Sequence, residues 1–222
     1  MQTTPFTHVI FDMDGTLLNS LDDLANACNH VCEMHGWPTF TLDEYRYKIG
    51  NGQPKLIERI IPAEFAGNGA VFEQTLKEFR AYYADHSEDN TAPYEGILEA
   101  LDALTKAGIP LAILSNKDHA AVVPLAQQYF GDRFAVVQGR TDAFPAKPAA
   151  PVTLHVLEQL DAQAETALYV GDSGVDIETG HNAGIRACGV SWGFRGRGEL
   201  EAAGADYVID EPAQLLDVIL GR

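Results

Sequence analysis

Cysteine, basic residues and long apolar runs are all scarce in this chain, and each shortage excludes a class of protein. Of 222 residues only 3 are cysteine: Cys28 and Cys32 lie one helical turn apart and Cys188 stands alone. This spacing provides neither a disulfide framework nor a Cys-x-x-Cys pair. No stretch is long and apolar enough to span a bilayer, and the first residues lack the basic start and apolar region of a signal peptide. We therefore expect a cytoplasmic protein without a membrane partner, whose cysteines are reduced and buried.

The shortage of basic residues excludes a further class. The chain has 15 lysines and arginines against 32 aspartates and glutamates, which gives a formal net charge of -17. A surface this acidic repels a phosphate backbone, so we expect no nucleic-acid partner. It also repels small anions, so a phosphate ligand has to be attracted by a locally positive site, such as a bound divalent cation with one or two lysines.

What the chain does contain is an apolar run that stops at two carboxylates. Residues 8–11 read HVIF and residues 12–16 read DMDGT. A short apolar run bounded by turn residues is typical of a strand buried on both faces of a parallel sheet. Asp12 and Asp14 then lie at the carboxyl edge of that sheet, where open α/β sheets bind ligands. A solvated acidic turn is the alternative, but such a turn needs no fully apolar strand before it.

Beyond this strand the sequence pattern divides the chain into two parts. Residues 20–86 show apolar positions at helical spacing and no convincing strand, and two spacings that are typical of capping boxes, Ser20 with Asp23 and Thr41 with Glu44, predict helix starts. From about residue 91 helix and strand patterns alternate, which indicates right-handed βαβ units and a parallel sheet. We therefore expect an α/β core with a helical insert.

Polar residues follow three further predicted strands. Ser115 and Asn116 follow strand 110–114, Lys147 lies in a loop after strand 134–137, and Asp172 and Asp176 follow strand 166–170. Three of these residues have an ordinary explanation, a helix N-cap for Ser115 or Asp176 and a solvated side chain for Lys147. Strand ends of a parallel sheet meet at one edge, however, so the four aspartates can converge. Converging carboxylates repel one another without a cation, and hard oxygen ligands favour Mg²⁺.

In their order along the chain, these motifs resemble the haloacid dehalogenase superfamily, whose phosphatases open with Asp-x-Asp-Gly-Thr after an apolar strand. The resemblance covers nearly the whole chain. It implies a Rossmann-like parallel-sheet core, here residues 1–16 and 91–222, with an α-helical cap domain, residues 17–90, inserted after the first motif. It further implies a phosphoric monoester hydrolase in which Asp12 is the nucleophile and Asp14 the general acid and base.

The same resemblance assigns the other polar residues. Ser115, Asn116 and Lys147 would bind the transferring phosphoryl group. Mg²⁺ would be held by the side chains of Asp12 and Asp172 and by the main-chain carbonyl of Asp14. Asp176 would then lie outside this ligand set and support it.

Several related activities are left open by these motifs. A dehalogenase or a phosphonatase of the superfamily lacks the second aspartate, so Asp14 argues against both. Sugar-phosphate mutases share Asp-x-Asp and the helical cap, and pyrophosphatases and nucleotide or sugar-phosphate phosphatases remain alternatives. From another class, a catalytically silent phosphate-binding regulator is possible on the same fold, although an intact nucleophile, lysine and metal ligands argue against it.

Substrate choice is predicted from the helical segment. Ile49-Gly50-Asn51-Gly52, with Lys55 after it, is similar to the cap segment of phosphoglycolate phosphatases, and so is the later Trp192-Gly193-Phe194. The resemblance implies a small phosphate ester, 2-phosphoglycolate, selected by Gly50, Asn51, Gly52 and Lys55. The ordinary alternative is a helix end at Gly50 and a solvated Lys55. The sequence leaves open whether the protein is a monomer or a homodimer.

Overall fold

The computed structural model describes residues 6–221, and the chain divides into two compact units. The core unit takes in the chain up to Leu18 and from Pro93 onward, and the helical unit is Asn19–Ala92. The chain passes between them in two short strands that pair with each other, β2 (Leu18–Asn19) and β3 (Ala92–Pro93). The units change after Leu18 and after Ala92, and the predicted domain boundaries, after residues 16 and 90, each lie two residues earlier.

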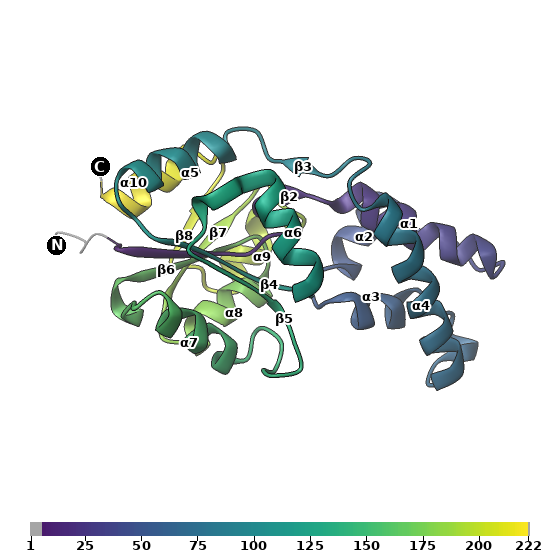
Figure 1. The fold of residues 1–222 in the computed structure, drawn as a ribbon. Helices are drawn as coiled ribbons and strands as arrows, with labels where there is room; N and C mark the ends of the chain where they lie inside the picture. Colours follow the sequence, from purple (N-terminus) through teal and green to yellow (C-terminus); the bar gives the residue numbers. More distant parts are fainter. Residues whose placement is uncertain (1–5, 222) are drawn as a thin grey trace. The chain divides into compact units, whose positions relative to one another are not determined.

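The core unit is built on a parallel sheet, as predicted. Its six strands have the order β5-β4-β1-β6-β7-β8 (Figure 1). Their bounds are β1 (His8–Phe11), β4 (Leu111–Asp118), β5 (Val136–Arg140), β6 (Ala167–Gly171), β7 (Arg186–Val190) and β8 (Tyr207–Ile209). The chain runs outward from β1 through β4 to β5 and then starts again at β6 on the other side of β1. The carboxyl ends of β1, β4 and β6 therefore meet at a topological switch point, where such sheets bind ligands.

Helices cover both faces of this sheet, which explains why residues 9–11 of β1 and residues 111–114 of β4 are apolar. Val9 and Phe11 pack into one apolar cluster with α5 (Ile97–Lys106), α6 (His119–Phe130) and α10 (Gln214–Leu220). Ile10 points to the opposite face and packs with α7 (Ala150–Gln159), while α8 (Gly174–Asn182) and α9 (Arg197–Ala202) pack on a third cluster. Figure 1 shows α5 and α10 on one side of the sheet and α7 and α8 on the other. Burial on both faces holds the end of β1 in place.

The helical unit contains α1 (Leu21–Met34), α2 (Leu42–Lys48), α3 (Gln53–Ile60), the short 3-10 helix η1 (Ala63–Phe65) and α4 (Gly69–His86). Helices account for the segment in which the sequence pattern predicts no strand. Within the described residues, no helix combines the length and the apolarity that crossing a membrane requires. Cys28, Cys32 and Cys188 are free and buried, as predicted.

One of the two predicted capping boxes is confirmed and the other is wrong. At α2 the Thr41 hydroxyl accepts from the Glu44 N–H, and the Glu44 carboxylate accepts in return from the Thr41 N–H at 2.8 Å. At α1 the N-cap residue Ser20 makes no capping hydrogen bond through its side chain.

Asp23, the acidic partner predicted for Ser20, has a different role. Its buried carboxylate accepts from the backbone N–H groups of Asn90 and Thr91 and, at 2.7 Å, from the Thr91 hydroxyl. These bonds connect the start of α1 to the segment after α4. The local spacing was misleading because the true partners lie 67 and 68 residues away.

Replacing Asp23 tests this connection. Asp23→Asn is expected to lower the free energy of unfolding by about 2 kcal/mol, because hydrogen bonds to a buried carboxylate are lost or left mismatched. Burial by itself would raise the pKa of Asp23, but the hydrogen bonds from Asn90 and Thr91 outweigh it and lower the pKa. The contribution is therefore fully present above about pH 4, the usual pKa of the unfolded carboxyl, and is lost as the pH falls through the lowered value.

Urea denaturation at neutral and acidic pH measures the effect, with the adjacent and more exposed Asp22→Asn as the matched control. A stability of Asp23→Asn equal to that of the wild type at neutral pH would contradict this role.

Candidate active site

The site begins where β1 ends. Asp12 is the first residue after the strand, and its Oδ1 accepts from the Met13 N–H at 2.7 Å. The next residues form a tight loop in which the N–H groups of Leu17 and Leu18 both bond to the Met13 carbonyl at 2.9 Å. Gly15 permits this loop because its φ of 85° lies in the left-handed region. Asp12 and Asp14 are therefore presented together at the carboxyl edge of the sheet.

Lys147 contacts side chains from three separate elements at this edge of the sheet. Its buried Nζ lies 3.0 Å from Asp12 Oδ1 and 2.8 Å from Asp176 Oδ1, and it donates to the Tyr169 hydroxyl at 3.0 Å. The Tyr169 hydroxyl donates in turn to the Leu114 carbonyl, which fixes the ring. Burial by itself would lower the pKa of Lys147, but Asp12 and Asp176 outweigh it and raise the pKa well above its usual value. Lys147 therefore remains an ammonium ion beside Asp12.

Asn116 holds the Lys147 backbone in position. Its Oδ1 accepts from the Lys147 N–H at 2.9 Å and its Nδ2 donates to the Lys147 carbonyl at 3.2 Å. In the structure the amide of Asn116 pairs with the lysine loop, and its role in phosphate binding stays a prediction. Ser115, also predicted to bind phosphate, is buried, and its Oγ accepts from the Lys117 N–H at 3.3 Å.

Asp172 packs against two glycines, Gly15 and Gly193, and accepts a hydrogen bond from a backbone N–H group. The Phe194 N–H donates to its Oδ2 at 2.7 Å. A Cβ atom at Gly15 would overlap with the Asp172 carboxylate, and a Cβ atom at Gly193 would overlap with both the Asp172 Cβ and the Gly15 carbonyl oxygen. The Trp192-Gly193-Phe194 segment noted in the sequence is therefore packed against the site, and the Trp192 indole donates to the Thr16 carbonyl.

Asp176 combines two tasks. Its Oδ2 accepts from the Ser173 N–H at 3.1 Å and from the Ser173 hydroxyl at 2.6 Å, which completes a capping box at the start of α8. Its Oδ1 is bonded to Lys147 at 2.8 Å. Both oxygens are thus engaged by the protein, and the supporting role of Asp176 stays a prediction.

The aspartates provide a set of donors that fits a divalent cation. Carboxylate oxygens of Asp12, Asp172 and Asp176 lie within 4.8 Å of one another, and residues 6–221 contain no other such group of three or more. Burial raises the pKa of Asp12 to about 7, against the opposing effect of Lys147. Burial, followed by repulsion from Asp176 and Asp12, raises the pKa of Asp172 well above its usual value. Lys147 balances one of these charges, and a hard cation would stabilise the ionised form of the others.

Sequence reasoning assigned no role to two residues of this site, Tyr169 and Lys117. Lys117 Nζ lies 3.1 and 3.3 Å from the two carboxylate oxygens of Asp14, and its side chain is only 4% exposed. The predicted strand stopped at residue 114, whereas β4 continues to Asp118 and so places Lys117 at the site. The signal that was available is the run of three polar residues, Ser115-Asn116-Lys117, after an apolar strand.

The four residues predicted to select the substrate all lie in the helical unit. Gly50 and Gly52 have φ values of 114° and 83°, so both positions require glycine. Asn51 Oδ1 accepts from Arg59 at 2.7 Å, and Lys55 forms an ion pair with Glu58 at 2.5 Å with about half of each side chain exposed. These contacts give Asn51 and Lys55 structural partners within their own unit.

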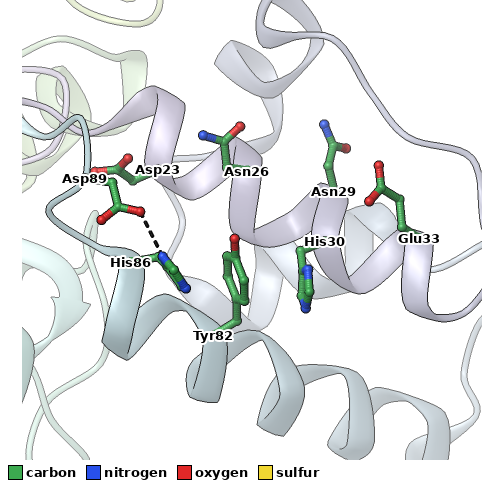
Figure 2. Close-up of a pocket in the computed structure, with 8 residues that line it drawn as sticks. All are labelled: Asp23, Asn26, Asn29, His30, Glu33, Tyr82, His86 and Asp89. Atoms are coloured by element: carbon green, nitrogen blue, oxygen red, sulfur yellow. Dashed lines mark hydrogen bonds and ion pairs between the residues drawn. The ribbon is translucent and has the colours of Figure 1, made fainter.

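A separate cavity of about 330 Å³ lies within the helical unit, between α1 and α4 (Figure 2). The ring of Tyr82 stacks between those of His30 and His86, with centroid distances of 4.0 and 4.2 Å. Among the polar groups around it, Asp89 bonds to His86 at 2.8 Å and Asp23 bonds to the Thr91 backbone N–H. This cavity offers no converging ligand set, unlike the end of β1.

Comparison with known proteins identifies the class to which this arrangement belongs. The family model described as haloacid dehalogenase-like hydrolase matches residues 9–190. The chain therefore belongs to the haloacid dehalogenase-like hydrolase family.

Within this family, the chain is similar to several individual proteins. The chain is 33% identical to the phosphoglycolate phosphatase of Chromobacterium violaceum over 95% of both chains. It is 34% identical to that of Vibrio vulnificus over 96% of this chain and 95% of the relative. The crystal structure of a protein from Lactobacillus delbrueckii subsp. bulgaricus superposes with a TM-score of 0.93 at 30% identity, covering 99% of this chain and all of that one.

The packing around Asp172 leads to a stability prediction. Gly193→Ala should lower the free energy of unfolding by about 1–3 kcal/mol, because the added methyl group overlaps with backbone and Cβ atoms that cannot rotate away. Gly198→Ala is the matched control, since a Cβ atom there meets nothing within 4 Å. It lies in a helix, so the change should be neutral or slightly stabilising. Urea denaturation of both variants measures the difference, and equal stabilities would show that the loop adapts freely.

Proposed function

We propose that this chain is an Mg²⁺-dependent phosphatase that hydrolyses a small phosphate monoester, 2-phosphoglycolate, to glycolate and phosphate. The observation that carries the proposal is the ammonium of Lys147, held between Asp12 and Asp176 at the carboxyl end of the central strand. This contact supports Asp12 as the nucleophile, because a neighbouring ammonium stabilises the carboxylate charge that attack on phosphorus requires. The relatives named phosphoglycolate phosphatase, matched over nearly the whole chain, support the choice of substrate.

The first step forms an aspartyl-phosphate. A carboxylate oxygen of Asp12 attacks phosphorus in line with the ester oxygen, and the bond from phosphorus to that oxygen breaks. Asp14 in its acid form gives its proton to the leaving oxygen, and glycolate departs as the alcohol. Lys147 and the hydroxyl of Ser115 hold oxygens of the phosphoryl group, and this positioning supplies much of the rate enhancement in phosphoryl transfer.

The second step releases phosphate. Asp14, now a carboxylate, accepts a proton from a water molecule that attacks phosphorus. The bond between phosphorus and the Asp12 oxygen breaks, which regenerates both aspartates. Asp14 therefore serves as acid and then as base, and its place two residues after the nucleophile keeps it beside the reacting bond.

Mg²⁺ would be held by the side chains of Asp12 and Asp172 and by the Asp14 carbonyl. When bound, it would neutralise charge on the carboxylates and on the phosphoryl oxygens. The buried oxygen donors of Asp12 and Asp172 fit such an ion. Asp176 and Gly193 would keep these ligands in place, the first through Lys147 and the second by leaving room for Asp172.

The helical unit is proposed to act as a cap domain that contributes to substrate choice through Gly50, Asn51, Gly52 and Lys55. The two glycines support this role because backbone N–H groups can approach an anion closely where no side chain is present. The cytoplasmic location, and a monomeric or homodimeric state, remain predictions from the sequence.

The nucleophile is tested by Asp12→Asn. This variant should lose phosphatase activity entirely, because an amide does not attack phosphorus, and its circular dichroism should match that of the wild type. Asp14→Asn should lose turnover for want of a proton donor and base. Asp142→Asn, at an exposed position of the core unit, is the control and should keep full activity. Phosphate release measured on a panel of phosphate esters gives the answer, and activity of Asp12→Asn above background would refute the mechanism.

The metal is tested by chelation. Excess chelator should abolish activity and Mg²⁺ should restore it, whereas Ca²⁺ should inhibit because it prefers more ligands at longer distances. Independently of activity, Mg²⁺ should raise the melting temperature of the wild type, as expected for a ligand that binds only the folded chain. Asp172→Asn should reduce that shift. Full activity in excess chelator would contradict the proposed metal dependence.

A further inference from the structure

We propose that Lys117 is a specificity-determining residue of the core unit, which binds a carboxylate carried on the carbon next to the phosphate ester oxygen. This inference rests on the proposed function, since it concerns how a phosphoglycolate phosphatase would recognise the acid end of its substrate. It places that recognition beside Asp14, and not only in the glycine turn of the helical unit.

The position of the ammonium relative to Asp14 is the main argument. To donate its proton, Asp14 has to lie within about 3 Å of the leaving oxygen. Lys117 Nζ lies 3.1 and 3.3 Å from the two oxygens of Asp14. In 2-phosphoglycolate the carboxylate carbon is two bonds, or about 2.5 Å, from that leaving oxygen. A substrate whose ester oxygen reaches Asp14 can therefore place its carboxylate within reach of the Lys117 ammonium.

The strand geometry gives a second argument. Ser115 and Lys117 are two residues apart at the carboxyl end of β4, where the pairing of β4 with β5 changes register between Leu114 and Asp118. Ser115 is the residue proposed to hold the phosphoryl group, and its Oγ accepts from the Lys117 N–H. One strand end can thus contact the phosphoryl group through Ser115 and the acid end through Lys117.

Charge and burial give a third argument. Lys147 is occupied by Asp12 and Asp176 beside the nucleophile, whereas Lys117 lies beside the acid and base. Its side chain is 4% exposed, and a charge removed from water interacts more strongly with an ionic ligand. In a chain with a net charge of -17, a second anionic group on the substrate is repelled unless a cation is placed to receive it.

The test compares two substrates of matched size, 2-phosphoglycolate and 2-hydroxyethyl phosphate, which carries a hydroxyl in place of the carboxylate. The wild type should prefer 2-phosphoglycolate. Lys117→Met should lower kcat/KM for both esters, because Asp14 loses its contact with the Lys117 ammonium, but by roughly 10- to 100-fold more for 2-phosphoglycolate. The additional loss should appear mainly in KM. Lys117→Arg should retain most of the preference, and Lys106→Met, at an exposed helical lysine, should retain all of it.

The outcomes separate this inference from the proposed function. If the wild type shows no preference for 2-phosphoglycolate, the proposed substrate is wrong and the inference is wrong with it. If the wild type shows the preference and Lys117→Met loses both activities equally, only the inference is overturned, and Lys117 merely positions Asp14. If Lys117→Met does not fold by circular dichroism, the ratio of the two kcat/KM values in Lys117→Gln and Lys117→Arg decides in the same way.

Discussion

The buried ion pair of Lys147 with Asp12 and Asp176 is the interaction on which the rest of the site depends. Charges removed from water are costly unless they are closely paired and hydrogen-bonded. Lys147 meets this condition with two carboxylates and the Tyr169 hydroxyl, while Asn116 holds its backbone. The Lys147 side chain therefore joins the end of β1 to β6 and to the first turn of α8. It also stabilises the negative charge on the carboxylate that the proposed mechanism uses as its nucleophile.

The close packing around Asp172 and Asp176 depends on glycines, which have no Cβ atom. Gly15 and Gly193 bring two backbone segments against Asp172, and a Cβ atom at Gly171 would overlap with that of Asp176. A larger residue at any of these positions would push a carboxylate away from Asp12. The oxygen donors that fit a cation are thus placed by small residues as much as by the aspartates themselves.

Two buried lysines of the core unit each form an ion pair with one of the aspartates that follow β1. Lys147 directly contacts Asp12, the proposed nucleophile, and Lys117 directly contacts Asp14, the proposed acid and base. Because both side chains are buried, their charges are little screened by solvent. The four aspartates of the site outnumber these two lysines, so the proposed cation would also be needed to attract a phosphate ester to a strongly acidic protein. The helical unit has its own internal connection, from Asp23 to Asn90 and Thr91, which does not depend on these charges.

The sequence by itself determined the parallel α/β core, the helical segment and the aspartates at strand ends, because strand burial and helix periodicity are local patterns that a short window of residues contains. It did not predict the roles of Lys117 and Tyr169, and it misread Asp23 as a cap of its own helix. Only the tertiary structure decided these, since Asp14 and Lys117 are 103 residues apart and Asp23 and Asn90 are 67 apart. A contact between distant residues depends on how the strands and helices pack, and no spacing within one segment records it.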